Sequence, residues 1–208
     1  MILLQKNQVK TMTSDERVAG LHSALMGVYK NKIEGDFVEC GVWMGGNVVI
    51  AKKFFDSVND SKRKFYAFDT FEGMTEPSEN DPSKAHKIWN TTASCLGPLE
   101  QVIAEFESHK VYDDRIVIVK GDVRSTLLDK KNIPEKIAIL RLDTDWYDST
   151  KIELEILYEK LVNGGYLIID DYGHWDGCKK AVDEFFGINF VDKNFKKLDY
   201  TGIIFQKN

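Results

Sequence analysis

The sequence predicts one α/β domain of the Rossmann-like, doubly wound type, in which helices cover both faces of a mostly parallel sheet. Expected strands and helices alternate along most of the 208 residues, the order that parallel strands with crossover helices require. Several strands are continuous apolar runs, IVIV, IAIL and YLII, as expected when both faces of a sheet are covered. The chain is long enough for one well-filled core and short for two, so we expect a single domain over residues 1–208.

Each expected element has a local signal. The first helix, over residues 14–31, begins at Ser14 and Asp15, which suit a helix cap, and carries apolar residues on one face. Later strands are short apolar runs, and later helices show apolar residues three or four apart. In chain order the elements are strand 37–42, helix 45–55, strand 64–70, helix 99–110, strand 115–121, a short helix near 122–129, strand 137–143, helix 149–161 capped by Asp148, strand 165–170 and helix 178–186.

The C-terminal end of the chain departs from this alternation. Residues 195–200 and 202–206 are predicted strands, joined by too few residues for a crossover helix. They are therefore expected to pair antiparallel, which closes the parallel sheet with an antiparallel last strand.

Residues 71–98 form the longest stretch without a clear pattern and are rich in Pro, Ser, Thr, Asn and acids. Loops of this length in a compact domain are usually lids or binding loops. Because the stretch follows the carboxyl end of a strand, we expect a lid-like insertion. Residues 1–34 are expected to form an N-terminal helical segment of the same domain.

Charge and composition exclude several classes of partner. The net charge is −5 and the pI about 5.5, without a dense basic block, which disfavours nucleic acid and anionic membranes as partners. No run approaches the ~20 apolar residues of a membrane span, and the N-terminal apolar run is too short for a secretory signal. We therefore expect a cytoplasmic protein. Cys40, Cys95 and Cys178 are widely spaced and fit neither a disulfide framework nor a zinc site.

The five expected parallel strands all end in carboxylic acids. In an open α/β sheet, ligands bind at the carboxyl ends of the strands, so these acids are candidate ligand contacts. In strand order they are Glu39, Asp69, Asp122, Asp143 with Asp145, and Asp170 with Asp171.

Four of these acids, Asp143, Asp145, Asp170 and Asp171, follow two neighbouring strands. Unpaired like charges at close range repel and raise each other's pKa, so something positive is expected between them. Carboxylate oxygens suit Mg²⁺, which keeps several waters and needs only two or three such ligands. We predict that Asp143, Asp170 and Asp171 hold Mg²⁺, against the alternative that they are solvated loop acids.

A glycine turn in VECGVWMGGN follows the first strand. Gly41, Gly45 and Gly46 precede a helix, so backbone N–H groups at its N-terminus could approach a ligand. The spacing misses the dinucleotide pattern GxGxxG. Asp69 ends the next strand, where an acid can accept both hydrogen bonds of a ribose diol, as in both NAD and S-adenosylmethionine sites. Asp122 either contacts an adenine or caps the short helix that follows it.

Four motifs together resemble a known family. GDFVECGVWMGGN, FYAFDTFEGM, LRLDTDWYDST and GGYLIIDDYGHWDGCKKAVDEF are similar to sequences of the macrocin and mycinamicin O-methyltransferases and the related novobiocin-pathway enzyme. The resemblance runs from about TSDERVAGL to the C-terminus. It implies a class I methyltransferase fold, a seven-stranded sheet with an antiparallel last strand, and dependence on S-adenosylmethionine and Mg²⁺.

The resemblance also implies roles for particular residues. Asp143, Asp170 and Asp171 would hold Mg²⁺, and Asp145 would be the general base. His174 is a rival base, against the alternative that it is an ordinary loop histidine. Expected contacts of the methyl donor, drawn from the motifs and the strand ends together, are Glu39, Gly41, Val42, Trp43, Gly45, Gly46, Asp69, Thr70, Phe71, Gly121, Asp122 and Asp143.

The expected reaction is methyl transfer to a hydroxyl group of a sugar or of another glycosylated or polyhydroxylated small molecule. Asp143 and Asp145 would then be catalytic, because an aliphatic hydroxyl needs activation before it can act as a nucleophile. Two alternatives are a nicotinamide-dependent oxidoreductase, which predicts a GxGxxG turn, and a non-catalytic cofactor-binding protein, which predicts broken metal acids. The resemblance further suggests a homo-oligomer, a dimer or larger, in which an N-terminal segment completes a neighbour's site.

Overall fold

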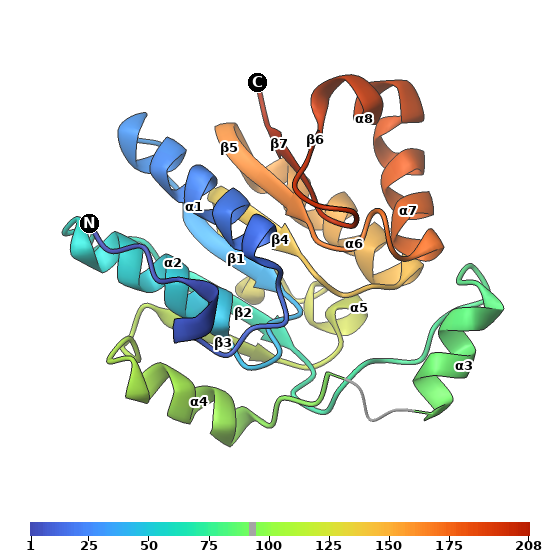
Figure 1. Ribbon diagram of the computed structural model, residues 1–208, viewed down its shortest axis with the longest axis horizontal. Helices are drawn as coiled ribbons and strands as arrows, with labels where there is room; N and C mark the ends of the chain where they lie inside the picture. The colour runs from blue at the N-terminus through green and yellow to red at the C-terminus, as the bar shows by residue number, and fades with distance from the viewer. Residues whose placement is uncertain (92–94) are drawn as a thin grey trace.

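The computed structural model describes residues 1–91 and 95–208, and its centre is a seven-stranded sheet (Figure 1). The strand order is β3-β2-β1-β4-β5-β7-β6. Strands β1 to β5 run parallel to one another, whereas β7 pairs antiparallel with both β5 and β6. The strands are β1 (Asp36–Cys40), β2 (Phe65–Asp69), β3 (Ile116–Lys120), β4 (Ile137–Leu142), β5 (Leu161–Ile169), β6 (Lys196–Lys197) and β7 (Ile203–Gln206). The predicted fold class and the antiparallel end of the sheet are confirmed.

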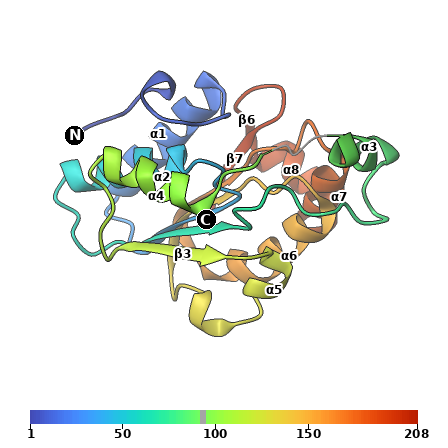
Figure 2. The same ribbon diagram turned by 90° about the horizontal axis from the view of Figure 1, so that it is seen from below.

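Helices cover both faces of the sheet (Figure 2). One apolar cluster joins the sheet to α1 (Asp15–Lys30), α2 (Gly46–Ser57) and α4 (Leu99–Ser108). A second cluster, on the opposite face, joins it to α5 (Val123–Thr126), α6 (Tyr147–Leu157), α7 (Asp176–Phe186) and α8 (Ile188–Asn194). Because both faces are covered, every residue of β4 is buried. This explains why the central strands are continuous apolar runs.

The first helix begins where its cap predicts. The Ser14 side chain accepts a hydrogen bond from the backbone N–H of Arg17 at 3.1 Å, which satisfies one of the free donors of the first turn. Three short 3₁₀ turns complete the regular elements of the described residues, at Lys6–Gln8, Lys130–Asn132 and Tyr158–Lys160.

The predicted cap of α6 is wrong. The helix begins at Tyr147, so Asp148 lies inside the first turn and does not precede it. The carboxylate of Asp81, distant in sequence, accepts the backbone N–H of Tyr147 at 2.9 Å. A cap supplied from another part of the chain leaves no local signal.

The insertion 71–98 is less irregular than predicted, because it contains α3 (Ser83–Thr91). The start of α3 follows Pro82, a residue suited to the first turn of a helix. The part before α3 is tied to the domain: the indole N–H of Trp146 donates to the carbonyl of Thr75 at 2.8 Å. Residues 92–94 of the expected lid lie outside the described residues. Helix α3 itself stands at one side of the sheet (Figure 1).

In the described part of the chain, no helix is both long and apolar enough to cross a membrane.

Candidate active site

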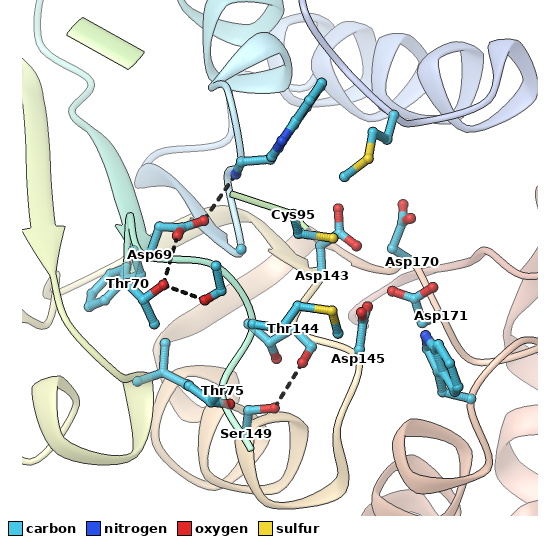
Figure 3. Close-up of a pocket in the computed structure, with 18 of the residues that line it drawn as sticks. Asp69, Thr70, Thr75, Cys95, Asp143, Thr144, Asp145, Ser149, Asp170 and Asp171 are labelled. Carbon is cyan, nitrogen blue, oxygen red and sulfur yellow. Dashed lines mark hydrogen bonds between the residues drawn. The ribbon is translucent and has the colours of Figure 1, made fainter. Parts of the chain in front are cut away.

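A cavity of about 440 Å³ lies at the carboxyl ends of the parallel strands (Figure 3). Its walls come from the turns that follow β1 to β5, from the residues before α1 and from the hairpin between β6 and β7. The predicted site residues that line it are Gly41, Trp43, Asp69, Thr70, Gly121, Asp122, Asp143, Asp145, Asp170, Asp171 and His174. Five predicted cofactor contacts do not line it: Glu39, Val42, Gly45, Gly46 and Phe71.

The turn after β1 needs glycine for close approach. Gly41 has a φ of +81°, and a Cβ there would overlap the carbonyl oxygen of Asp143. The backbones that follow β1 and β4 can therefore touch, which brings Asp143 to the cavity wall. Gly45 and Gly46 allow close packing away from the cavity. A Cβ at Gly45 would overlap the ring of Phe106, and a Cβ at Gly46 would overlap the carbonyl of Lys10.

Asp69 joins two turns of the cavity wall. Its Oδ2 accepts the backbone N–H groups of Val42 at 2.8 Å and Trp43 at 3.0 Å, and its Oδ1 accepts that of Phe71 at 2.8 Å. Burial raises the pKa of Asp69, and these three donors act in the opposite direction. Val42 and Phe71 thus contribute through backbone groups that hold the Asp69 carboxylate.

Asp122 has one of the two roles that its position allowed, the helix cap, and its contact with an adenine stays a prediction. It caps α5 by accepting the backbone N–H of Arg124 at 2.8 Å, and it also lines the cavity. Burial acts to raise its pKa, but the hydrogen bonds from Arg124 outweigh burial and bring the pKa below its usual value.

Glu39 is fully buried beneath the cavity. Its Oε1 accepts hydrogen bonds from Asn47 at 3.0 Å and from Arg141 at 2.7 Å. Burial, only partly offset by Arg141, raises the pKa of Glu39 to about 7. The residue therefore supports the floor of the site in this structure and does not face the cavity.

Three carboxylates converge in the cavity, those of Asp143, Asp145 and Asp171, which we call the acid cluster. Each offers an oxygen, and these oxygens lie within 4.8 Å of one another (Figure 3). The buried Oδ2 of Asp171 has no hydrogen-bond partner among the described residues. Burial followed by mutual repulsion raises the pKa of Asp171 well above its usual range. Burial chiefly, with a contribution from Asp143, raises that of Asp145 to about 7.

Asp170 faces the same region but is already neutralised. Its carboxylate is bonded to the guanidinium groups of Arg17, from α1, and Arg141, from β4. The sequence predicted a metal set of Asp143, Asp170 and Asp171. In the structure, the three acids close enough to share an ion are Asp143, Asp145 and Asp171.

Arg141 is the functional residue that sequence reasoning missed. Its side chain is 2% exposed, with Nη1 2.7 Å from Glu39 and 2.6 Å from Asp143, and Nη2 bonded to Asp170. It supplies part of the positive charge expected between the acids. A signal was available, because an arginine inside the apolar run IAILRL must find partners when it is buried.

His174 stands at the rim of the cavity, four residues after Asp170. Its Nδ1 lies 3.3 Å from the hydroxyl oxygen of Tyr200, and its ring meets the edge of Trp175. Burial, followed by repulsion from nearby cations, lowers the pKa of His174. The imidazole is therefore neutral at pH 7 and able to accept a proton.

The acid cluster fits a divalent cation. Three carboxylates, one with an unpartnered buried oxygen, form a hard oxygen donor set of the kind that Mg²⁺ prefers. Burial, together with the neighbouring carboxylates, raises the pKa values of Asp145 and Asp171, as expected where acids share a buried site. Among the residues that the structure describes, no histidine or cysteine is close enough to share an ion with these three acids, which disfavours zinc.

Comparison with known proteins gives the family. The sequence model of the family described as macrocin O-methyltransferase (TylF) matches residues 6–207. The chain is 31% identical over 198 residues to the 8-demethyl-8-(2,3-dimethoxy-alpha-L-rhamnosyl)-tetracenomycin-C 4'-O-methyltransferase of Streptomyces olivaceus, covering 94% of this chain and 75% of the relative. It is 28% identical over 200 residues to the demethyldecarbamoylnovobiocin O-methyltransferase of Streptomyces niveus, covering 95% of this chain and 75% of the relative.

Solved structures agree with this result. The O-methyltransferase NovP has a TM-score of 0.86 and 29% sequence identity, covering 95% of this chain and 82% of that one. CalS11, a calicheamicin methyltransferase, shares the fold with a TM-score of 0.70 and 18% identity, covering 90% of this chain and 77% of that one. These matches confirm the resemblance drawn from the four motifs and favour methyl transfer over hydride transfer. The chain therefore belongs to the macrocin O-methyltransferase (TylF) family and has the fold of S-adenosylmethionine-dependent methyltransferases.

Proposed function

We propose that this protein transfers the methyl group of S-adenosylmethionine to a sugar hydroxyl of a glycosylated small molecule, with Mg²⁺ held by the acid cluster. The observation that carries the proposal is the convergence of Asp143, Asp145 and Asp171, with oxygens within 4.8 Å of one another, inside the cavity. Among the described residues Asp145 and Asp171 have no ion-pair partner and Asp143 has only Arg141, so a cation that completes the site best explains the cluster.

The methyl donor would occupy the part of the cavity beside β1, β2 and β3. Gly41 and Trp43 line it after β1, Asp69 and Thr70 after β2, and Gly121 after β3. Asp69 is well suited to a ribose because it lies at the strand end that meets the ribose in this class of fold. Its oxygens are already oriented by three backbone N–H groups, so little reorganisation would accompany binding.

The acceptor would enter on the side of the acid cluster. An aliphatic hydroxyl is a poor nucleophile at neutral pH, and bound Mg²⁺ would lower its pKa and orient its oxygen toward the methyl group. Asp143, Asp145 and Asp171 hold the ion in this proposal. In this proposal Asp170 keeps its ion pairs with Arg17 and Arg141, which hold the end of β5 in place.

Two side chains can take the hydroxyl proton. Asp145 belongs to the acid cluster, and His174 stands at the rim beside it. Proton transfer to a positioned base typically contributes about 10²–10⁴-fold to the rate. If Asp145 is the base, His174→Gln keeps the pH profile of kcat. If His174 is the base, that variant loses the acidic limb of the profile.

The acceptor class is inferred from the relatives and from the cavity wall. Relatives are named for methylating a rhamnosyl tetracenomycin and, for the one from Micromonospora griseorubida, the 3'' position of mycinamicin III. Around the acid cluster the wall combines Trp175 and Tyr200 with His174 and Thr201. Aromatic rings with polar tips suit a ligand that has both apolar and hydroxyl-bearing parts.

Three further expectations remain predictions. The insertion 71–98 would act as a lid, because Thr75 and Cys95 from its two ends line the cavity. A homo-oligomer is predicted from the family resemblance. A cytoplasmic location is predicted from the sequence.

The test is methyl transfer to defined acceptors with and without a chelator. Purified protein is incubated with S-adenosylmethionine and the acceptors named for three relatives, the rhamnosyl tetracenomycin, demethyldecarbamoylnovobiocin and mycinamicin III. S-adenosylhomocysteine release and the position of the new methyl group are measured. We expect a methyl ether on a sugar hydroxyl with Mg²⁺ and its loss with EDTA. Transfer to nitrogen, or transfer that EDTA does not affect, would contradict the proposal.

A further inference from the structure

We propose that Glu153 is a positioning residue that, through Thr144, holds the turn carrying Asp143 and Asp145 in the shape that forms the acid cluster. The inference rests on the proposed function, because the groups that Glu153 would position are the proposed cation ligands. It concerns a helix residue that does not line the cavity.

Glu153 is a buried acid with an unusual environment. It lies on α6 with 0% exposure, on the face of the sheet where apolar side chains gather. Its Oε1 accepts the Thr144 hydroxyl at 2.9 Å, and its buried Oε2 has no hydrogen-bond partner among the described residues. Burial raises the pKa of Glu153 well above its usual range. A buried polar group with one unsatisfied atom is costly and calls for an explanation.

Thr144 links this acid to the active-site turn. It is the residue between Asp143 and Asp145, and its hydroxyl and its carbonyl are both held by α6. The hydroxyl donates to Glu153 at 2.9 Å, and the carbonyl accepts the Ser149 hydroxyl at 3.2 Å (Figure 3). The carbonyl also accepts the backbone N–H of Trp146 at 2.7 Å, which closes the turn.

The turn itself needs external support. Asp145 has a φ of +67°, in the left-handed region that a non-glycine residue rarely adopts. Such a conformation persists only where surrounding contacts determine it, and it is often found at functional sites. The left-handed turn carries the Asp145 carboxylate that faces Asp143 and Asp171. The Glu153–Thr144 hydrogen bond is therefore in position to keep the acid cluster assembled.

A purely structural role predicts a different result from a positioning role. Replacing Glu153 by leucine puts an apolar side chain in an apolar cluster, a change that is often neutral or stabilising for the fold. Thr144 lies partly exposed and can be hydrated when its partner is gone. Under the positioning role, this variant keeps its stability but binds Mg²⁺ less tightly.

The test compares four single variants and one double variant. Mg²⁺ affinity is measured by calorimetry in protein loaded with S-adenosylhomocysteine, and hydrogen–deuterium exchange is followed in peptides that cover residues 143–149. Glu153→Leu and Thr144→Val remove the hydrogen bond. Glu153→Gln and Thr144→Ser keep it and serve as matched controls. The double variant Glu153→Leu with Thr144→Val tests whether the two residues act as one unit.

We expect Glu153→Leu and Thr144→Val each to weaken Mg²⁺ binding by about 10–100-fold, as the loss of an outer partner of a metal ligand does. Exchange in residues 143–149 should rise in the metal-free protein. In both controls the Mg²⁺ affinity should stay within about twofold of the wild-type value. The double variant should lose no more affinity than the single variant with the larger loss, because the effects of residues in one network are not additive.

Three outcomes separate the possible failures. Wild-type Mg²⁺ affinity and exchange in folded Glu153→Leu, with only a change in melting temperature, would overturn the inference and leave the proposed function intact. If Glu153→Leu does not fold, the same comparison is made with Thr144→Val. Wild-type Mg²⁺ affinity and exchange in that variant would overturn the inference. If the wild-type protein takes up S-adenosylhomocysteine but no Mg²⁺, the metal-dependent function fails, and the inference fails with it.

Discussion

The Nη1 atom of Arg141 lies 2.6 Å from Oδ2 of Asp143, two residues along the chain at the end of β4. Residues two apart on a strand share a face, so the guanidinium and the carboxylate point to the same side of the sheet. The same guanidinium also bonds Glu39 and Asp170. One cation thus ties together the ends of three neighbouring strands, β1, β4 and β5.

Removing this cation should destabilise the protein strongly. Arg141→Met leaves the buried Glu39 without its ion-pair partner and Asp170 with Arg17 alone, and breaking a buried ion pair from one side typically costs about 3–5 kcal/mol. The free energy of unfolding, measured by urea denaturation, checks this. Arg141→Lys keeps the charge but loses the two-pronged geometry, so we expect an intermediate loss. An unchanged urea midpoint in Arg141→Met would show that the ion network does not stabilise the fold.

The two adjacent acids after β5 should differ in their effect on metal binding. Asp171 has an unpartnered oxygen in the acid cluster, whereas Asp170 is bonded to two arginines. Asp171→Asn should weaken Mg²⁺ affinity at least about tenfold, since even outer-sphere losses reach that size. Asp170→Asn should mainly lower the melting temperature. Calorimetric titration with Mg²⁺ checks which of the two variants loses more affinity. A larger loss in Asp170→Asn would support the metal ligands predicted from the sequence, Asp143, Asp170 and Asp171.

The stability of the metal-free protein should fall as the pH rises toward neutrality. The pKa of Asp145 is about 7 in the folded state, against 3.8 for an ordinary aspartate. The folded state therefore holds a proton that the unfolded state has released, and the stability linked to that proton is lost between about pH 4 and pH 7. Under the proposed function Mg²⁺ would bind the deprotonated acids, so its stabilising effect should grow over the same range.

Melting temperatures measured from pH 5 to pH 8, with EDTA and with Mg²⁺, check this dependence. Asp145→Asn removes the titrating group and should flatten both trends. Equal slopes in the wild type and in this variant would assign the pH dependence to other groups, of which Asp171 in the acid cluster, with its raised pKa, and Glu39, with a pKa of about 7, are the first to test.

The cap of α6 provides a matched pair of variants. Asp81 accepts the backbone N–H of Tyr147 and the N–H of Ser78 at 2.9 Å each. Asp81→Ala should therefore cost about 1 kcal/mol, the usual effect of losing a helix cap. Asp148→Ala should change the stability by less than about 0.5 kcal/mol, because Asp148 caps no helix. Chemical denaturation compares the two, and an equal loss in both variants would contradict the assignment.

Much of the fold was predictable because its signals are local. Alternating apolar periods marked the elements from α1 to α7, apart from α3, and the short link between β6 and β7 required antiparallel pairing. The boundaries of α6 and the presence of α3 and α8 were missed. In α6 the reason is clear, since its cap, Asp81, lies in a segment far away in the sequence.

The sequence by itself determined that acids at the ends of five parallel strands meet at one edge of the sheet, because strand direction follows from alternating elements and strand ends are local features. It also identified the family through four motifs. Only the tertiary structure decided which acids are free to bind a cation. Asp170 and Asp171 are neighbours in the chain, yet the first is neutralised by Arg17 and Arg141 and the second joins Asp143 and Asp145. The physical reason is that electrostatic pairing depends on distances between side chains from different elements, and those distances exist only once α1, β4 and β5 have packed together.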